Sequence, residues 1–97
     1  MDAARDDPGH LEHLRRLPCC SCGQAPAGIA HHSTHHADRG MARKAPDWAA
    51  MPVCDRCHQS LHARTWGPFA GWSKTRANEW QDRMVEVYRP DRTSDVF

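Results

Sequence analysis

The chain has 97 residues, 39% of them hydrophobic, and its formal net charge at pH 7 is only +1. A single domain of this length lies near the lower limit of what a hydrophobic core stabilises alone, so we expect a structural metal to supplement the core. The first ten residues are polar and no apolar stretch approaches the roughly 18 residues of a membrane span, which predicts a cytoplasmic protein with reduced thiols and no membrane partner.

One domain is predicted between two disordered ends. We expect residues 1–9 and 90–97 to be disordered and residues 10–89 to fold together. Leucines at three-residue spacing predict a first helix over residues 10–17, which Pro18 ends. Two short strands and two further helices are predicted to follow, at residues 29–33, 48–53, about 55–64 and 74–88. The last helix carries an apolar stripe for core packing, formed by Ala77, Trp80, Met84 and Val87 or Tyr88.

Four cysteines are spaced as two Cys-x-x-Cys pairs, Cys19 with Cys22 and Cys54 with Cys57. Two such pairs on either side of a folded segment are typical of a four-thiolate zinc site, and soft thiolates select zinc over magnesium or calcium. A closed set of four leaves no open coordination position, so this zinc is predicted to be structural. Cys20 is one residue too close to Cys22 for the same pairing and is interpreted as a spare thiol. The alternative is that the cysteines are simply free and buried.

Four histidines indicate a second metal site. His58 and His62 are four residues apart on a predicted helix, which puts both side chains on one face. His31 and His32 are adjacent on a predicted strand, so they point to opposite sides and only one of them is expected to bind the same ion. The other would face something else, such as water or a substrate phosphate.

This ordered set of motifs resembles the HNH, or ββα-metal, nuclease family. The similarity covers about residues 8–85 and looks closest to the phage-encoded branch that includes the RecA-dependent recombination-enhancement (Ref-like) nucleases. The matching segments are Leu-Pro-Cys-Cys-Ser-Cys-Gly at 17–23, Ala-His-His at 30–32, Gly-Met-Ala-Arg-Lys-Ala-Pro-Asp at 40–47, Met-Pro-Val-Cys-Asp-Arg-Cys-His at 51–58 and Leu-His at 61–62. The resemblance implies a small α+β zinc-stapled domain, in which a ββα-metal (HNH or treble-clef-like) finger has flanking N-terminal and C-terminal helices.

The resemblance also implies roles for individual histidines. His31, His58 and His62 would bind the catalytic metal, and His32 would be the general base. The implied activity is that of a metal-dependent DNA endonuclease, which hydrolyses phosphodiester bonds to 5′-phosphate and 3′-hydroxyl ends. Besides the structural Zn²⁺, the implied cofactor is a catalytic divalent metal, Zn²⁺, Mn²⁺, Ni²⁺, Co²⁺ or Mg²⁺.

One position departs from the family pattern. Ala49 stands where many members place the middle Asn, and Asp47 is the nearest polar residue that could brace the hairpin. Arg43, Lys44 and Arg64 are candidates to hold the DNA backbone. No base-reading element is evident, so we expect low sequence specificity or specificity supplied by a partner. DNA is the predicted partner, with a RecA-type filament or another phage recombination protein as a further one.

Two other function classes stay open. A non-catalytic zinc module would bind DNA or protein through the same scaffold, and it would share the four cysteines but have no need for four histidines together. A small zinc hydrolase acting on another substrate would also use three histidines and an open position. Such an enzyme would want a concave pocket, which short elements in a chain of this size are not expected to form.

Overall fold

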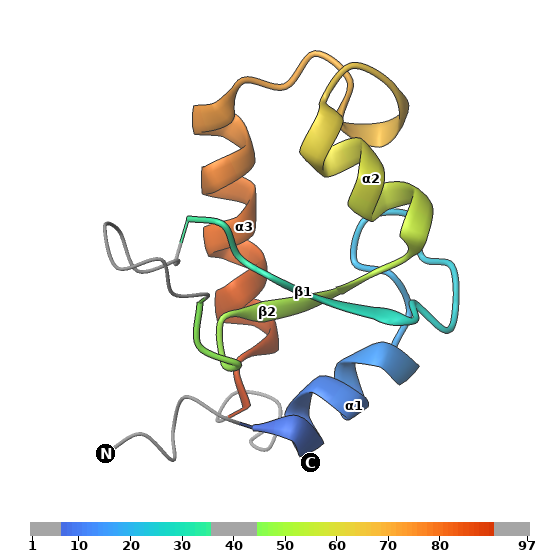
Figure 1. Cartoon of the computed structure of the whole chain (residues 1–97), viewed down its shortest axis with the longest axis vertical. Coiled ribbons are helices and arrows are strands. Elements are labelled where there is room, and N and C mark those ends of the chain that lie inside the picture. Colours follow the sequence, from blue (N-terminus) through green and yellow to red (C-terminus); the bar gives the residue numbers. More distant parts are fainter. Residues whose placement is uncertain (1–6, 36–44, 91–97) are drawn as a thin grey trace.

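The structure, a computed structural model, describes residues 7–35 and 45–90. Over these residues the chain forms a small α+β domain with a two-stranded antiparallel sheet and surrounding helices (Figure 1). In chain order the elements are α1 (Pro8–Arg16), β1 (Ile29–His32), β2 (Ala50–Val53), α2 (Asp55–Ala63), the 3-10 helix η2 (Gly67–Phe69) and α3 (Lys74–Tyr88). The predicted α+β class is confirmed, and α3 has its predicted bounds. None of the helices in the described ranges combines the length and the apolar character needed to cross a membrane.

Helix α1 begins at Pro8, two residues before its predicted start. The side chain of Asp7 accepts a hydrogen bond from the backbone N–H of His10 at 3.1 Å, which caps the helix. Pro8 lies in the first turn of the helix. Backbone N–H groups there have no acceptor within the helix, so the N–H that proline lacks costs no helical hydrogen bond. The prediction of disorder up to residue 9 is therefore wrong for residues 7–9, because an Asp-Pro pair starts the helix. Residue 90, the first of the predicted C-terminal tail, is described, and the other residues of the predicted disordered ends, 1–6 and 91–97, lie outside the described residues.

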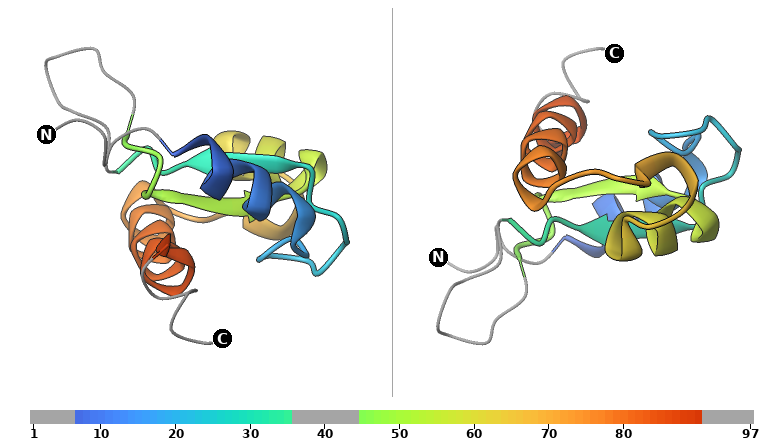
Figure 2. Two further views of the ribbon diagram at one scale, coloured as in Figure 1. Left: turned by 90° about the horizontal axis from the view of Figure 1, so that it is seen from below. Right: turned by 90° about the horizontal axis from the view of Figure 1, so that it is seen from above.

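The hairpin of β1 and β2 forms the middle of the molecule. Ile29 pairs with Val53 and His32 pairs with Ala50. Strand β2 is two residues shorter than predicted, because residues 48 and 49 belong to the turn that precedes it. All of β2 is buried, since α1 packs on both strands and α3 packs on β2. Figures 1 and 2 show the hairpin with the three α-helices placed around it.

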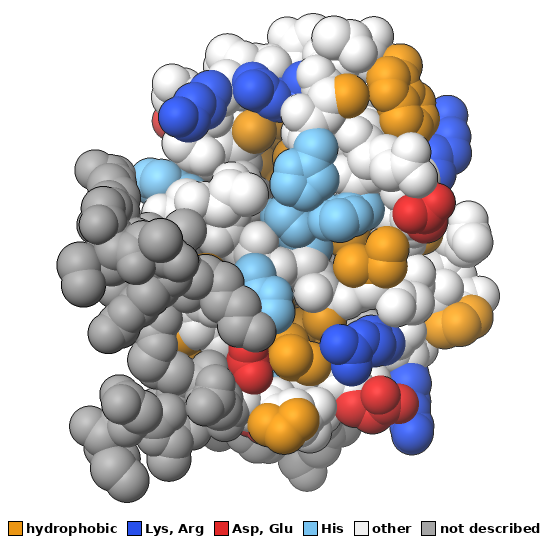
Figure 3. Space-filling model, in the orientation of Figure 1, with side chains coloured by type: hydrophobic (Ala, Val, Ile, Leu, Met, Phe, Trp, Pro, Cys, Tyr) orange, Lys and Arg blue, Asp and Glu red, His pale blue; other side chains and the backbone are white. Residues whose placement is uncertain are grey.

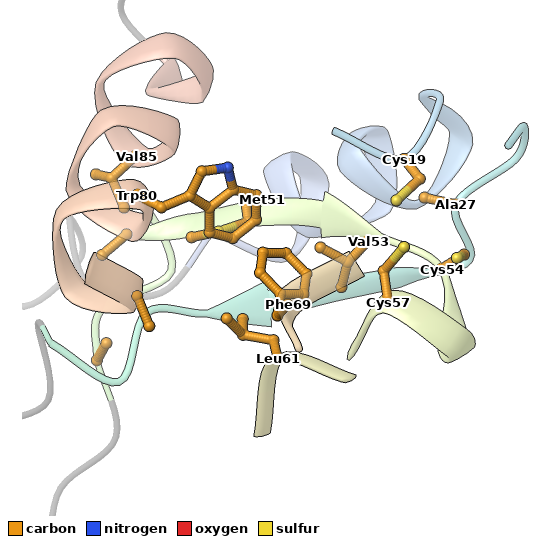
Figure 4. Packing of buried hydrophobic residues seen from close by; sticks show 13 residues of the cluster. Cys19, Ala27, Met51, Val53, Cys54, Cys57, Leu61, Phe69, Trp80 and Val85 are labelled. Atoms are coloured by element: carbon orange, nitrogen blue, oxygen red, sulfur yellow. The ribbon is translucent and has the colours of Figure 1, made fainter. Parts of the chain in front are cut away.

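The core joins β2 to the helices on either side of it. Figure 4 shows Met51 and Val53 of β2 beside Phe69 and Trp80, with the cysteine sulfurs at one end of the cluster. The Phe69 and Trp80 rings meet edge to face, with their centroids 4.9 Å apart. Of the two residues predicted to complete the apolar stripe of α3, Tyr88 does so and Val87 does not, since Val87 is 55% exposed. It lies about 100° around the helix from Tyr88, which does pack against the core.

The connection from α2 to α3 closes tightly on Ser60. The Ser60 hydroxyl donates to the carbonyl of Trp66 at 2.5 Å and accepts from the N–H of Phe69 at 3.0 Å. Gly67 has a φ of +74°, and a Cβ at this position would stand 2.9 Å from Ser60 Oγ. Only glycine fits both the left-handed backbone and this close approach, so the connection has a fixed shape.

Candidate metal centres

Four cysteine sulfurs come together at one end of the core. Cys19 and Cys22 lie in the turn that follows α1, Cys54 directly follows β2, and Cys57 lies in the first turn of α2. One sulfur from each residue lies within 4.8 Å of the other three. The structure thus brings together the four cysteines of the predicted zinc site.

The backbone shapes the first cysteine pair into a turn suited to metal binding. The N–H groups of Ser21 and Cys22 donate to Cys19 Sγ at 3.4 and 3.5 Å. The N–H of Gly23 donates to the carbonyl of Cys19 at 2.9 Å, and Gly23 takes the left-handed φ of +84° that this tight turn requires. Burial raises the pKa of the Cys19 thiol, but hydrogen bonds from the backbone outweigh burial and bring the pKa down to about 7.

The sulfur spacing suits a tetrahedral zinc ion. Cys22 Sγ and Cys54 Sγ are 3.6 Å apart. Two sulfurs bound to one tetrahedral zinc at about 2.3 Å each stand roughly 3.8 Å apart. The four thiols could therefore hold a metal such as zinc. Cys20 is not one of the four, and burial raises the pKa of its thiol to about 12, so it stays protonated.

Three histidine rings meet between β1 and α2. The ring centroid of His31 lies 5.0 Å from that of His58 and 5.4 Å from that of His62. The Nε2 atoms of His58 and His62 are 3.2 Å apart, close to the roughly 3.3 Å expected for two nitrogens on a tetrahedral ion with bonds of about 2.0–2.1 Å. One nitrogen from each of the three rings lies within 4.8 Å of the others, so this set could also hold a metal ion.

The histidine cluster opens to the surface. His31 is buried, whereas His58 is half-buried and His62 is exposed. Figure 3 shows histidine side chains gathered near the middle of one face, with Lys and Arg side chains on several sides of them. An ion held by three imidazoles here would keep an open position on the solvent side.

His32 is not one of the three clustered histidines, and its side chain contacts Asp47. The two side chains are joined by a hydrogen bond of 2.8 Å between His32 Nε2 and Asp47 Oδ1. Asp47 is only 5% exposed, and its Oδ2 accepts the backbone N–H of Asp7 at 2.7 Å. Asp47 therefore links β1, the turn before β2 and the start of α1. Because an ionised carboxylate only accepts, the proton of this bond is on His32 Nε2, and the lone pair of the ring is on Nδ1.

Of the three residues predicted to contact the DNA backbone, the structure describes only Arg64. Arg43 and Lys44 lie outside the described residues. Arg64 ends α2 in a left-handed conformation with φ of 55°, and its guanidinium donates to the carbonyl of Trp72 at 3.2 Å. Arg64 therefore helps to hold the connection between α2 and α3, and one of its donors is engaged within the domain.

Gln81 of α3 is a site residue that the predicted motifs do not include. It is 2% exposed, and its Oε1 lies 3.0 Å from His31 Nε2. The sequence does carry a signal for it. Gln81 is a polar residue inside the apolar face of α3, between Trp80 and Met84, and a buried polar side chain needs a partner.

Burial lowers the pKa of His31 to about 4, from an ordinary value near 6.5. As the pH falls from about 6.5 to 4, the unfolded chain therefore takes up a proton that the folded protein does not bind. We expect the free energy of unfolding to fall over this window, by about 3 kcal/mol in total, and to be fully restored above pH 6.5.

The measurement is urea unfolding at several pH values, with a mild chelator present so that no metal competes for the imidazoles. The control is His31→Leu, which keeps all five cysteines but has no group to titrate at this position. The difference between the two proteins isolates the contribution of His31. Parallel pH profiles for wild type and His31→Leu would contradict the prediction.

The fold and the two donor sets define a small α+β domain with side chains suited to metal binding. Residues 5–75 match the model of the family described as protein of unknown function (DUF968), and the chain belongs to this family. A stretch of 52 residues is 42% identical to the uncharacterized protein YdfU of Escherichia coli strain K12. This stretch covers 54% of the chain but only 15% of that relative's length. No solved structure matches the chain significantly.

Proposed function

We propose that this protein is a metal-dependent DNA endonuclease of the HNH, or ββα-metal, type. The observation that carries the proposal is that two adjacent histidines on β1 make different contacts. His31 joins His58 and His62 in one cluster of imidazoles, whereas His32 is held by the buried carboxylate of Asp47. A metal-binding set next to a separately oriented imidazole is the combination that hydrolysis of a phosphodiester needs.

His31, His58 and His62 would hold the divalent ion, through which phosphate charge is neutralised and the departing 3′-oxygen is stabilised. His32 would remove a proton from water at Nδ1, because Asp47 keeps the other proton on Nε2. The water oxygen forms the new bond to phosphorus, and the bond from phosphorus to the 3′-oxygen breaks. The 3′-oxygen takes a proton from solvent, which leaves 5′-phosphate and 3′-hydroxyl ends.

Asp47 would act as a positioning residue in this scheme. Its two oxygens hold His32 and the backbone N–H of Asp7 at the same time, so the carboxylate cannot turn without breaking one bond. This is a more specific role than the bracing of the hairpin expected from the sequence. The cysteine set would hold the structural zinc, since Cys54 and Cys57 stand at the junction of β2 with α2.

The test is a nicking assay on supercoiled plasmid at pH 7.5. We expect the wild-type protein to convert supercoiled plasmid to nicked circles with at least one of manganese, magnesium, nickel, cobalt or zinc. EDTA should abolish the activity and metal add-back should restore it, because the proposed reaction needs an ion at the histidine cluster. The control is His62→Ala, which removes an exposed ligand and should give no nicking.

No nicking by the wild type with any of these metals, on naked plasmid and on RecA-coated DNA, would overturn the endonuclease proposal. Binding of DNA without cleavage in the same samples would then favour the non-catalytic zinc module. Equal nicking by wild type and His62→Ala would show that the histidine cluster is not the reaction centre.

A further inference from the structure

The hydrogen bonds around Gln81 fix the side on which His31 carries its proton. The backbone N–H of Thr34 donates to Gln81 Oε1 at 2.9 Å. A backbone N–H can only donate, so the atom that it reaches must be the amide oxygen of Gln81 and not the nitrogen. The amide nitrogen agrees with this orientation, since it donates to the Thr34 hydroxyl at 3.1 Å.

The same oxygen lies 3.0 Å from His31 Nε2. An amide oxygen has no proton to give, so His31 Nε2 must be the donor of this bond. In the neutral ring the proton is then on Nε2 and the lone pair is on Nδ1. The lone pair on Nδ1 is what a metal ion requires of a histidine ligand.

We infer that Gln81 is a positioning residue for the histidine metal site, and that it holds His31 as the Nε2-protonated form so that Nδ1 binds the ion. This inference rests on the metal site of the proposed function. It adds α3 to the elements that build the site, because the buried Gln81 of α3 contacts His31 of β1 and the following Thr34.

The contact also fixes the orientation of the His31 ring. Gln81 is 2% exposed and His31 is 4% exposed, so water cannot replace either partner of the bond. The amide group itself is held from both ends by Thr34, which leaves it no alternative orientation. His58 and His62, in contrast, come from α2 and face each other through Nε2. We therefore expect one Nδ1 ligand from β1 and two Nε2 ligands from α2.

The first test needs no substitution. Full-length protein labelled with ¹⁵N at histidine is loaded with zinc and studied near pH 7.5 by NMR spectra that correlate ring nitrogens with ring carbon-bound protons. These spectra show which nitrogen of each ring is protonated and which binds metal. The expected result is that His31 binds zinc through Nδ1 and keeps its proton on Nε2. Binding through Nε2, or zinc binding without His31, would overturn the inference.

The second test compares three substitutions on α3. Gln81→Leu removes the acceptor at similar volume and should weaken zinc binding at the histidine site by about 10–100-fold. Gln81→Glu keeps an oxygen that can accept from both His31 and Thr34, so it should retain the ligation through Nδ1 and rescue the affinity. Asp82→Asn is the matched control, because Asp82 is adjacent on α3 but contacts His35 instead of His31.

The readouts are zinc affinity by calorimetry and the nitrogen spectrum of each variant. Unchanged affinity in Gln81→Leu, or equal losses in Gln81→Leu and Gln81→Glu, would show that Gln81 does not act through its acceptor oxygen. If Gln81→Leu does not fold, the nitrogen spectrum of the wild-type protein and the zinc affinity of Gln81→Glu still test the inference. Zinc bound through His31 Nδ1 together with no plasmid nicking would overturn the endonuclease proposal while the role of Gln81 stands.

Discussion

Cys54→Ser is expected to abolish the cooperative folding of the domain. Cys54 is 3% exposed and lies between the end of β2 and the start of α2. A metal ion bound to its sulfur would therefore hold the junction of these two elements. Structural zinc sites bind with apparent free energies of about 10–16 kcal/mol, which is as large as the whole stability of a small domain at about 5–15 kcal/mol. Circular dichroism during thermal unfolding and zinc content by mass spectrometry measure the effect.

The matched control for this substitution is Cys20→Ser. Cys20 is a half-buried thiol that packs against the same core but is not one of the four converging sulfurs. We expect this variant to keep its zinc and its unfolding transition, with a modest loss of stability. A Cys54→Ser protein that folds cooperatively without zinc would show that the four thiols do not hold a structural metal.

His32→Ala is expected to lose cleavage by about 10²–10⁴-fold, the usual contribution of a general base. Folding, zinc content and DNA affinity should stay near wild type, because His32 is outside the cluster of His31, His58 and His62. This pattern separates a base from a metal ligand, whose loss removes metal and activity together. The measurements are plasmid nicking rates, zinc content and DNA binding by fluorescence anisotropy.

His13→Ala provides the control for this second substitution. His13 lies in the last turn of α1 and is exposed, so its loss removes an imidazole far in sequence from the cluster and should leave cleavage unchanged. Equal cleavage by His32→Ala and wild type would move the base to another group. A loss of metal in His32→Ala would show that His32 is a ligand and not a base.

The cysteine pairs and the helical histidine pair of the two candidate centres could be predicted from the sequence because they follow local spacing, whereas the choice of His31 over His32 came from the resemblance to the HNH family. Two Cys-x-x-Cys pairs and an i,i+4 histidine pair each define their own geometry, and the alternation of side chains on a strand separates His31 from His32. These relations need no knowledge of how distant elements pack. The same local rules gave the bounds of α3 and the place of both strands to within a few residues.

The partners of the ligands could not be predicted in the same way. Gln81 is 50 residues from His31 in the sequence, and Asp47 is 40 residues from Asp7, whose backbone N–H donates to the Asp47 carboxylate. Such contacts depend on how α3 and α1 pack against the hairpin, which spacing does not encode. The start of α1 is a different case, because the Asp-Pro signal is local and predicts the observed cap at Asp7.

Helix α2 carries ligands of both candidate centres in consecutive positions, since Cys57 is followed directly by His58. An ion among the thiols would fix the first turn of α2, and with it the direction in which His58 faces His31. The two ions would then bind cooperatively, and by thermodynamic reciprocity each would raise the affinity for the other by the same factor. Loading would be ordered, with the thiols filled first, so a shortage of metal would empty the imidazole centre while the thiols still held their ion.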